Sequence, residues 1–394
     1  MAAISLETRA SHVQENVYLD AQSASEPVHF GNAQIYKNIE DYIQSCTLSF
    51  SGEKKFYYAR MGNPTNRMLE EKIAALENAQ DALVVSSGMA AFSSTIFAFC
   101  NHGKHIVAPI NLSADKEIFL EEYIQKFSIR VDRVDFQNLD SLRCAIRPDT
   151  RLVFVEFPSV PFSQTVDLEA IAQIVHEKQV LFVVDSTTAS PSCIKPLDFH
   201  ADLVVASASK YMSGHSDCIG GYIAGNKTLL TQIANQSLML GNVLGPMDAA
   251  SILKGSRTLD IRMERHTQNA MEVASFLSSH SKVSRVFYPG LPENPEISLA
   301  KKQMKRFGGM IFFSLHSDLQ SCFRFLNSIR LCYIGFSFGD SMTILEHLSS
   351  MSYLGVSSSR KNQMGISDSM LRISVGIEKI DDILRDLDYA LRKA

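Results

Sequence analysis

One lysine stands where an apolar, valine-rich run ends and a Gly/Ser turn begins. The run 203–206 leads through Ser207 and Ser209 to Lys210, and Ser213-Gly214 follow. A strand that ends in this way places its lysine at the rim of an α/β sheet, where the active sites of such proteins form. Partial burial there would lower the pKa of the lysine and make its neutral amine a nucleophile. Most lysines are simply solvated, so Lys210 needs support from the rest of the chain.

Two other apolar runs also end in residues that can do chemistry. Asp185 follows the run 180–184, a place where a carboxylate is unfavourable without a cationic partner. The run 81–85 leads into the segment SSGM at 86–89, a strand–glycine–helix junction. Its backbone N–H groups and positive dipole end suit a phosphate. Each feature also has a plain alternative, because Asp185 could cap a turn and the junction could be an ordinary tight turn.

Together these pieces describe a site for pyridoxal 5′-phosphate. The junction at 86–89 supplies a phosphate cradle, to which Ser207 and Ser209 add hydroxyl donors. Asp185 supplies an acid for a protonated ring nitrogen, and Lys210 supplies an amine that forms an imine with an aldehyde. A hydrogen bond between charged partners contributes about 1.5–3 kcal/mol, enough to keep the ring protonated near neutral pH.

The elements that must position these residues alternate between strand and helix. Strands are predicted at 81–85, 105–110, 130–135, 151–156 and 180–184, with helices at 92–99, 116–126, 139–146 and 170–177. This order predicts a mostly parallel, three-layer α/β domain with its ligands at the strand ends. A polar, helix-rich region follows Gly220-Gly221. We predict an N-terminal arm at 1–60 that lies on the body or on a neighbouring subunit, a large cofactor-binding domain at 61–257, and a smaller α+β domain at 258–394.

Composition excludes several classes of partner. The 394 residues carry a net charge of −4, with 45% hydrophobic and 20% charged residues, so nucleic acid and anionic membranes are not expected partners. No apolar run is long enough to span a membrane, and the N-terminal stretch has no signal-peptide pattern. The seven cysteines are scattered without a CxxC pair, which favours a reducing, cytoplasmic location and argues against a structural metal.

The sequence resembles the Cys/Met-metabolism enzymes that use pyridoxal phosphate, a family that includes cystathionine γ-synthase, cystathionine γ-lyase and methionine γ-lyase. The resemblance runs from about residue 56 to the C-terminus and keeps the order and approximate spacing of the family's motifs. These motifs are YARMGNPTNRMLE at 58–70, SSGMAA at 86–91, VVDSTTASP at 183–191, SASKYMSGHSDCIGG at 207–221, LGPMDAASILKGSRTLDIRMERHTQNA at 244–270, FGGM at 307–310 and LRISVGIE at 371–378.

The resemblance implies the fold, the assembly and a role for each matching residue. The fold would be the aspartate-aminotransferase-like fold type I, in a homotetramer built from two dimers that share active sites. Lys210 would form the internal aldimine, Asp185 would face the pyridine nitrogen with Thr187 beyond it, and Arg372, helped by Ser337, would hold the substrate α-carboxylate. The phosphate would be held by Ser87, Gly88, Met89, Ser207 and Ser209, and by Tyr58 and Arg60 of the neighbouring subunit.

Three positions depart from the family pattern, all on the substrate side. Ser113 stands where the family has a tyrosine that stacks on the cofactor, and loss of such a ring removes about 0.5–1.5 kcal/mol of packing along with its hydroxyl. Val160 replaces an asparagine that would reach the phenolic oxygen of the cofactor. Met342 replaces a usual glutamate. We therefore count Ser113 and Val160 with Ser337 and Arg372 as substrate-side residues.

The predicted activity is β- or γ-elimination, or γ-replacement, on an L-amino acid that carries a side-chain leaving group. An alternative is a specialised biosynthetic enzyme with an altered substrate or reaction, or a degenerate homologue with weak lyase activity. A different class, a non-enzymatic Rossmann-like nucleotide binder, would need only the phosphate junction.

Overall fold

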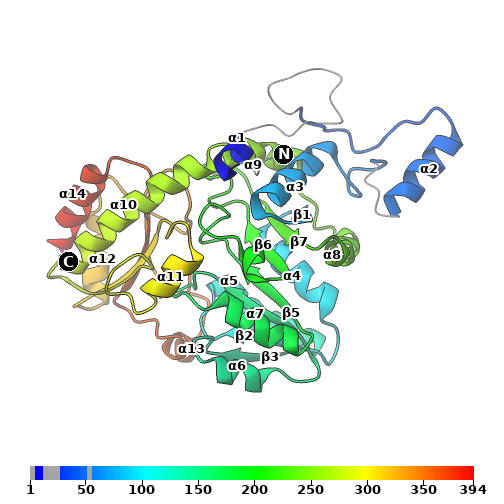
Figure 1. The fold of residues 1–394 in the computed structure, drawn as a ribbon. Coiled ribbons are helices and arrows are strands. Elements are labelled where there is room, and N and C mark those ends of the chain that lie inside the picture. Colours follow the sequence, from blue (N-terminus) through cyan, green and yellow to red (C-terminus); the bar gives the residue numbers. More distant parts are fainter. Residues whose placement is uncertain (1–4, 12–26, 51–55) are drawn as a thin grey trace.

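The computed structural model describes residues 5–11, 27–50 and 56–394, and these form two β-sheets covered by helices (Figure 1). The larger sheet has seven strands in the order β1-β7-β6-β5-β4-β2-β3. Its strands are β1 Asp81–Val85, β2 His105–Pro109, β3 Arg130–Val134, β4 Thr150–Glu156, β5 Leu181–Asp185, β6 Leu203–Ser207 and β7 Gly221–Gly225.

Five strands of this sheet run parallel, so the predicted mostly parallel architecture is confirmed. β3, β2, β4, β5 and β6 pair in parallel, whereas β7 is antiparallel to both β6 and β1. Strand β7 lies in the region that we expected to be helical. Its five residues begin and end with glycine, which weakens any strand signal in the sequence.

Helices cover both faces of the larger sheet and make the expected three layers. Alternate residues of each strand point to opposite faces: Val153 and Val155 of β4 enter one core, and Leu152 and Phe154 enter the other. The first core is covered by α3 Pro64–Glu77, α6 Leu139–Ala145, α7 Leu168–Glu177 and α9 Pro246–Ser256. The second is covered by α4 Gly88–Phe99, α8 Lys227–Leu240 and the short segments α5 Ala114–Ile118, η1 Phe119–Tyr123 and η2 Ile124–Phe127.

The smaller sheet has five strands in the order β10-β11-β12-β9-β8. It packs with its own buried apolar cluster against α10 Leu259–Ser279. The start of α10 contributes Leu259 and Met263 to the core of the larger sheet, and its later turns contribute Val273 and Leu277 to the core of the smaller one. The other elements of this region are β8 Val283–Phe287, α11 Ile297–Gln303, β9 Met310–Leu315, α12 Leu319–Ser328, β10 Tyr333–Ile334, β11 Ile344–His347, α13 Ser358–Gln363, β12 Met370–Ser374 and α14 Ile380–Leu391.

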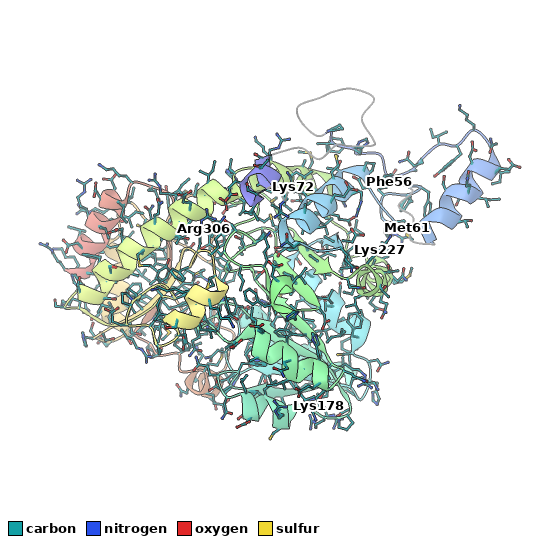
Figure 2. The ribbon with its side chains drawn as sticks, in the orientation of Figure 1. Phe56, Met61, Lys72, Lys178, Lys227 and Arg306 are labelled. Carbon is teal, nitrogen blue, oxygen red and sulfur yellow. The ribbon has the colours of Figure 1, made fainter. Side chains whose placement is uncertain are left out.

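The two helices of the N-terminal region differ in how they contact the rest of the chain. Helix α1 Leu6–Ser11 packs on α3, where Lys72 Nζ donates to the carbonyl oxygens of Arg9 and Ala10 at 2.8 and 2.9 Å (Figure 2). Helix α2 Ile39–Phe50 projects from the body and exposes apolar side chains such as Ile43 (Figure 1). Residues 1–4, 12–26 and 51–55 of the predicted arm lie outside the described residues. Across the described ranges, no helix combines the length and apolarity needed to cross a membrane.

Candidate functional site

The candidate site begins at Lys210, in the turn that follows β6. Its Nζ donates to Ser337 Oγ at 3.1 Å and lies 4.9 Å from the centre of the Phe338 ring. Burial and the neighbouring Arg372 guanidinium lower the pKa of Lys210 to about 8. A substantial fraction of this amine is therefore uncharged and nucleophilic at mildly alkaline pH.

The start of α4 lies directly against the end of β6. The hydroxyl of Ser87 caps the helix by accepting from the N–H of Ala90 at 3.0 Å. A Cβ on Gly88 would lie 2.7 Å from Ser207 Cβ, so only glycine allows this close approach. The first-turn N–H groups of α4, Met89 included, have no intrahelical partner and are placed beside the β6 turn. The hydroxyl of Ser209 ties that turn to Gly220, donating to its carbonyl at 3.2 Å and accepting from its N–H at 3.0 Å.

Asp185 ends β5 almost completely buried, with 3% of its surface exposed. Its Oδ1 accepts from the N–H of Thr187 at 2.8 Å, and the Thr187 hydroxyl accepts from the N–H of Ser207 at 2.9 Å. This chain of bonds fixes the Asp185 carboxylate relative to the α4–β6 junction. Its other oxygen, Oδ2, lies 2.8 Å from Lys116 Nζ.

Lys116 and Glu156 are site residues that the sequence analysis missed. Lys116 Nζ donates to Glu156 Oε1 at 2.6 Å and to Ser113 Oγ at 3.1 Å, in addition to its contact with Asp185. Ser113 donates from its hydroxyl to Glu156 Oε1 at 2.7 Å and from its N–H to Glu156 Oε2 at 2.8 Å. Ser113, which we predicted to stand at the tyrosine position of the resembling family, is thus held in a buried ion network. The position of Asp185 at the end of an apolar strand predicted that it has a cationic partner. The sequence spacing between Asp185 and its lysines did not indicate that this partner is Lys116.

Arg372 approaches the same region from the smaller sheet. It stands in register with Glu346 of β11, and its Nη1 lies 3.0 Å from Glu346 Oε1. Its Nη2 donates to the carbonyl oxygen of Ser337 at 2.8 Å, and its buried Nε has no hydrogen-bond partner among the described residues. Ser337 therefore contacts both Arg372 and Lys210.

Val160 and Met342 lie in different surroundings. Val160 is 6% exposed and belongs to an apolar cluster with Ala114, Phe312 and Tyr353, against which Phe338 packs. Because Phe338 also lies beneath the Lys210 amine, this cluster is continuous with the apolar wall of the lysine site. Met342 is 40% exposed, and its N–H donates to Asp340 Oδ1 at 3.1 Å.

Tyr58 and Arg60 lie at the surface, in the turn before α3. Arg60 stacks over the Tyr58 ring at 5.7 Å, and its Nη1 contacts Met61 Sδ at 3.6 Å. Tyr58 also forms an antiparallel bridge with Ala33, and within the described part of a single chain neither Tyr58 nor Arg60 hydrogen-bonds to Lys210.

Arg262 of α10 supports the turn that carries Lys210. Its guanidinium donates to the carbonyl oxygens of Tyr211 at 2.8 Å and Gly255 at 2.9 Å, while Gly214 passes so close that a Cβ there would overlap the guanidinium. Gly214 also has φ of +75°, which favours glycine.

We expect Gly214→Ala to destabilise the protein more than Gly103→Ala, which is its matched control. Gly103 has φ of +78° but nothing within 4 Å of an added Cβ, so it carries the backbone strain alone, roughly 1–2 kcal/mol. Gly214→Ala adds displacement of Arg262, for a further loss of about 1–3 kcal/mol. Denaturant unfolding of both variants measures the difference, and equal free energies of unfolding would show that Arg262 yields without loss.

The geometry can be set against known proteins. The family model for Cys/Met metabolism PLP-dependent enzymes matches residues 7–392. The chain belongs to this family. It is 42% identical over 370 residues, covering 93% of both proteins, to an L-methionine gamma-lyase of Fusobacterium nucleatum subsp. polymorphum.

Solved structures of the family superpose along nearly the whole chain. A cystathionine gamma-synthase of Xanthomonas oryzae pv. oryzae, in complex with aminoacrylate and cysteine, has a TM-score of 0.92 at 30% identity and covers 99% of this chain and 98% of its own. A cystathionine gamma-lyase of Lactobacillus plantarum, complexed with L-serine, has a TM-score of 0.91 at 30% identity and covers 99% of both chains. The predicted fold type I, the pyridoxal phosphate dependence and the membership of the Cys/Met-metabolism enzymes are confirmed.

The residues present fit pyridoxal phosphate. The close approach of Gly88 to Ser207 leaves a helix N-terminus beside a hydroxyl-lined turn, as a phosphate requires. Asp185 presents a fixed carboxylate for a ring nitrogen, and Lys210 presents a buried amine of lowered pKa. The unpaired Nε of Arg372 leaves a buried donor for a ligand carboxylate.

Proposed function

We propose that this enzyme removes a leaving group from the γ-carbon of an L-amino acid with an apolar, thioether-type side chain. The observation that carries the proposal is the sharing of Ser337 by Lys210 and Arg372. The Lys210 amine and the Arg372 guanidinium both contact this one residue, a proximity that would suit the amino and carboxylate groups of an α-amino acid. The continuous apolar wall of Phe338 and Val160 favours an uncharged side chain, and the similarity to a methionine gamma-lyase supports γ-chemistry.

Each residue would act through its own chemistry. When bound, pyridoxal phosphate supplies an electron sink for the substrate carbons. Lys210 would hold it covalently and then move protons between those carbons, since its lowered pKa lets the amine both accept and release a proton near neutral pH. Arg372 would orient the substrate by its carboxylate, and Phe338 would exclude water beside the amine.

The anchoring residues would keep the cofactor fixed without taking part in proton movement. Asp185, positioned through Thr187, would hold the ring nitrogen, and Ser113 would act on the ring only indirectly through Glu156. The phosphate-binding set would be Ser87, Gly88, Met89, Ser207 and Ser209 of one chain.

We also propose a shared active site in a homotetramer built from two dimers, and a cytoplasmic location. Tyr58 and Arg60 are exposed in the single chain, as residues that serve a neighbouring subunit must be. The apolar side chains exposed on the projecting α2 offer surface for such a contact. The dispersed, unpaired cysteines fit a reducing compartment.

The function is tested by incubating the purified holoenzyme with L-methionine, cystathionine, O-acylhomoserines, homocysteine and cysteine in separate reactions. We expect methionine and water to yield 2-oxobutanoate, methanethiol and ammonia, measured as 2-oxo acid and ammonia in equal amounts. Formation of pyruvate from cysteine alone would contradict γ-chemistry. Holoenzyme that yields no 2-oxo acid from any of these substrates would instead support the degenerate or redirected homologue.

A further inference from the structure

Two carboxylates share one ammonium at the base of the candidate cofactor site. Glu156 of β4 and Asp185 of β5 stand in register on adjacent parallel strands, and both side chains are 4% exposed. Lys116 Nζ bridges them at 2.6 and 2.8 Å. Its third N–H donates to Ser113 Oγ, so all three donors of the ammonium are used.

The Lys116 ammonium holds its proton more tightly than an ordinary lysine does. Burial alone would lower the pKa of Lys116, but Asp185 and Glu156 together raise it above its ordinary value. Its remaining surroundings are the rings of Phe92 and Phe154, at 5.9 and 6.0 Å. Lys116 therefore contributes a positive charge to this network near neutral pH.

The charges of this network decide what Asp185 can do for a ring nitrogen. Asp185 and Lys116 alone would form a neutral pair, and a neutral pair has little tendency to hold a second cation. With Glu156 the network carries one net negative charge, which a single protonated ring nitrogen neutralises. Other titratable groups around the network do not alter this sum. Glu117 of α5 pairs with Arg360 at 2.7 Å and Arg133 at 3.0 Å, and burial raises the pKa of Tyr222 and of Tyr353, which keeps both phenols neutral.

We propose that Glu156 and Lys116 are positioning residues that set how strongly Asp185 holds the proton on the pyridine nitrogen of the cofactor. Glu156 offsets the Lys116 ammonium, and Asp185 is thereby left able to pair with the ring. Lys116 in turn prevents two in-register buried carboxylates from facing each other without a cation. The inference rests on the proposed placement of Asp185 at the ring nitrogen.

The test is a titration of the ring nitrogen in holoenzyme reconstituted with pyridoxal 5′-phosphate labelled with ¹⁵N in the ring. In Glu156→Gln the network becomes neutral, and we expect the ring nitrogen to lose its proton at lower pH, by roughly one to two pH units for one unit charge removed a few ångströms away. In Glu156→Gln/Lys116→Met the net charge returns to −1, and the titration should return toward that of the unmodified enzyme.

The two variants control for each other. In Glu156→Gln the amide must turn its NH2 group toward either the N–H of Ser113 or the Lys116 ammonium, because it has only one acceptor oxygen for these two donors. The double variant removes the ammonium, so recovery reports the removal of that charge and of its demand for an acceptor. Glu117→Gln is a second control, because it also removes a buried carboxylate from the helix that carries Lys116. The carboxylate of Glu117 pairs with Arg360 and Arg133 and not with Lys116. Glu117→Gln should leave the ring titration unchanged.

Several outcomes would overturn the inference. These are a Glu156→Gln titration equal to that of the unmodified enzyme, no recovery in the double variant, or an equal effect of Glu117→Gln. If Glu156→Gln does not fold, Glu156→Met serves alone: it also leaves the network neutral and must lower the pKa of the ring nitrogen, and no fall contradicts the proposal. Unmodified protein that does not retain pyridoxal phosphate would instead defeat the proposed function.

Discussion

Lys210→Ala is expected to lose the visible absorbance band of the bound cofactor and to reduce turnover by roughly four orders of magnitude or more, the size of effect seen when a covalent catalytic group is removed. The reason is that Lys210 is proposed as both the anchor and the base: its amine is partly buried over Phe338, and its pKa is lowered to about 8. Absorbance of the purified protein before and after borohydride treatment, with single-turnover rates, measures both effects.

Lys301→Ala is the matched control for this prediction. Lys301 lies on α11 and is exposed, and its substitution removes a lysine without touching the site. It should retain the band and its sensitivity to borohydride. A Lys210→Ala protein that keeps a borohydride-sensitive band would show that another lysine holds the cofactor.

Substitution of Arg372 is expected to change both substrate binding and stability. Arg372→Met removes the donor that we propose for the substrate carboxylate, a charge-assisted hydrogen bond worth about 1.5–3 kcal/mol, so KM should rise at least roughly 10- to 100-fold. It also leaves the buried Glu346 carboxylate without a cation, with the Ser352 hydroxyl as its remaining donor, which should lower the free energy of unfolding by about 3–5 kcal/mol. Steady-state kinetics and denaturant unfolding measure the two losses separately.

The double variant Arg372→Met/Glu346→Gln separates recognition from folding. Without the Glu346 charge there is no uncompensated carboxylate, so most of the stability should return. Substrate binding should not return, because the guanidinium is still missing. Recovery of KM together with stability would show that Arg372 acts on the fold and that another group holds the substrate.

Local sequence patterns predicted most of the framework. The strand Asp81–Val85 has the predicted bounds, because it is a short apolar run between polar and glycine-containing segments. The segment 116–126 was predicted as one helix and consists of α, π and 3₁₀ pieces. Strands β7 and β11 were missed, since five or fewer residues at a glycine or a polar loop give too little periodicity.

Only those site residues could be predicted that are reactive or charged and stand directly at the end of an apolar run. Lys210 and Asp185 end valine-rich runs, and this pattern is visible in the sequence. The partner of Asp185 is not visible in the sequence, because Lys116 comes from the segment after β2, almost 70 residues earlier in the chain. Glu156 shares register with Asp185 only once the parallel pairing of β4 and β5 is known. The roles assigned to the individual site residues stay predictions until they are measured.

Ser337 joins the two halves of this site through two different atoms. Its hydroxyl accepts from Lys210, which follows the last parallel strand of the larger sheet, and its carbonyl accepts from Arg372 of the smaller sheet. Any movement that separates the two sheets must lengthen one of these bonds. Ser337 thus couples the positions of the two sheets, and the distance between the Lys210 amine and the Ser337 hydroxyl would report a change in the separation of the sheets.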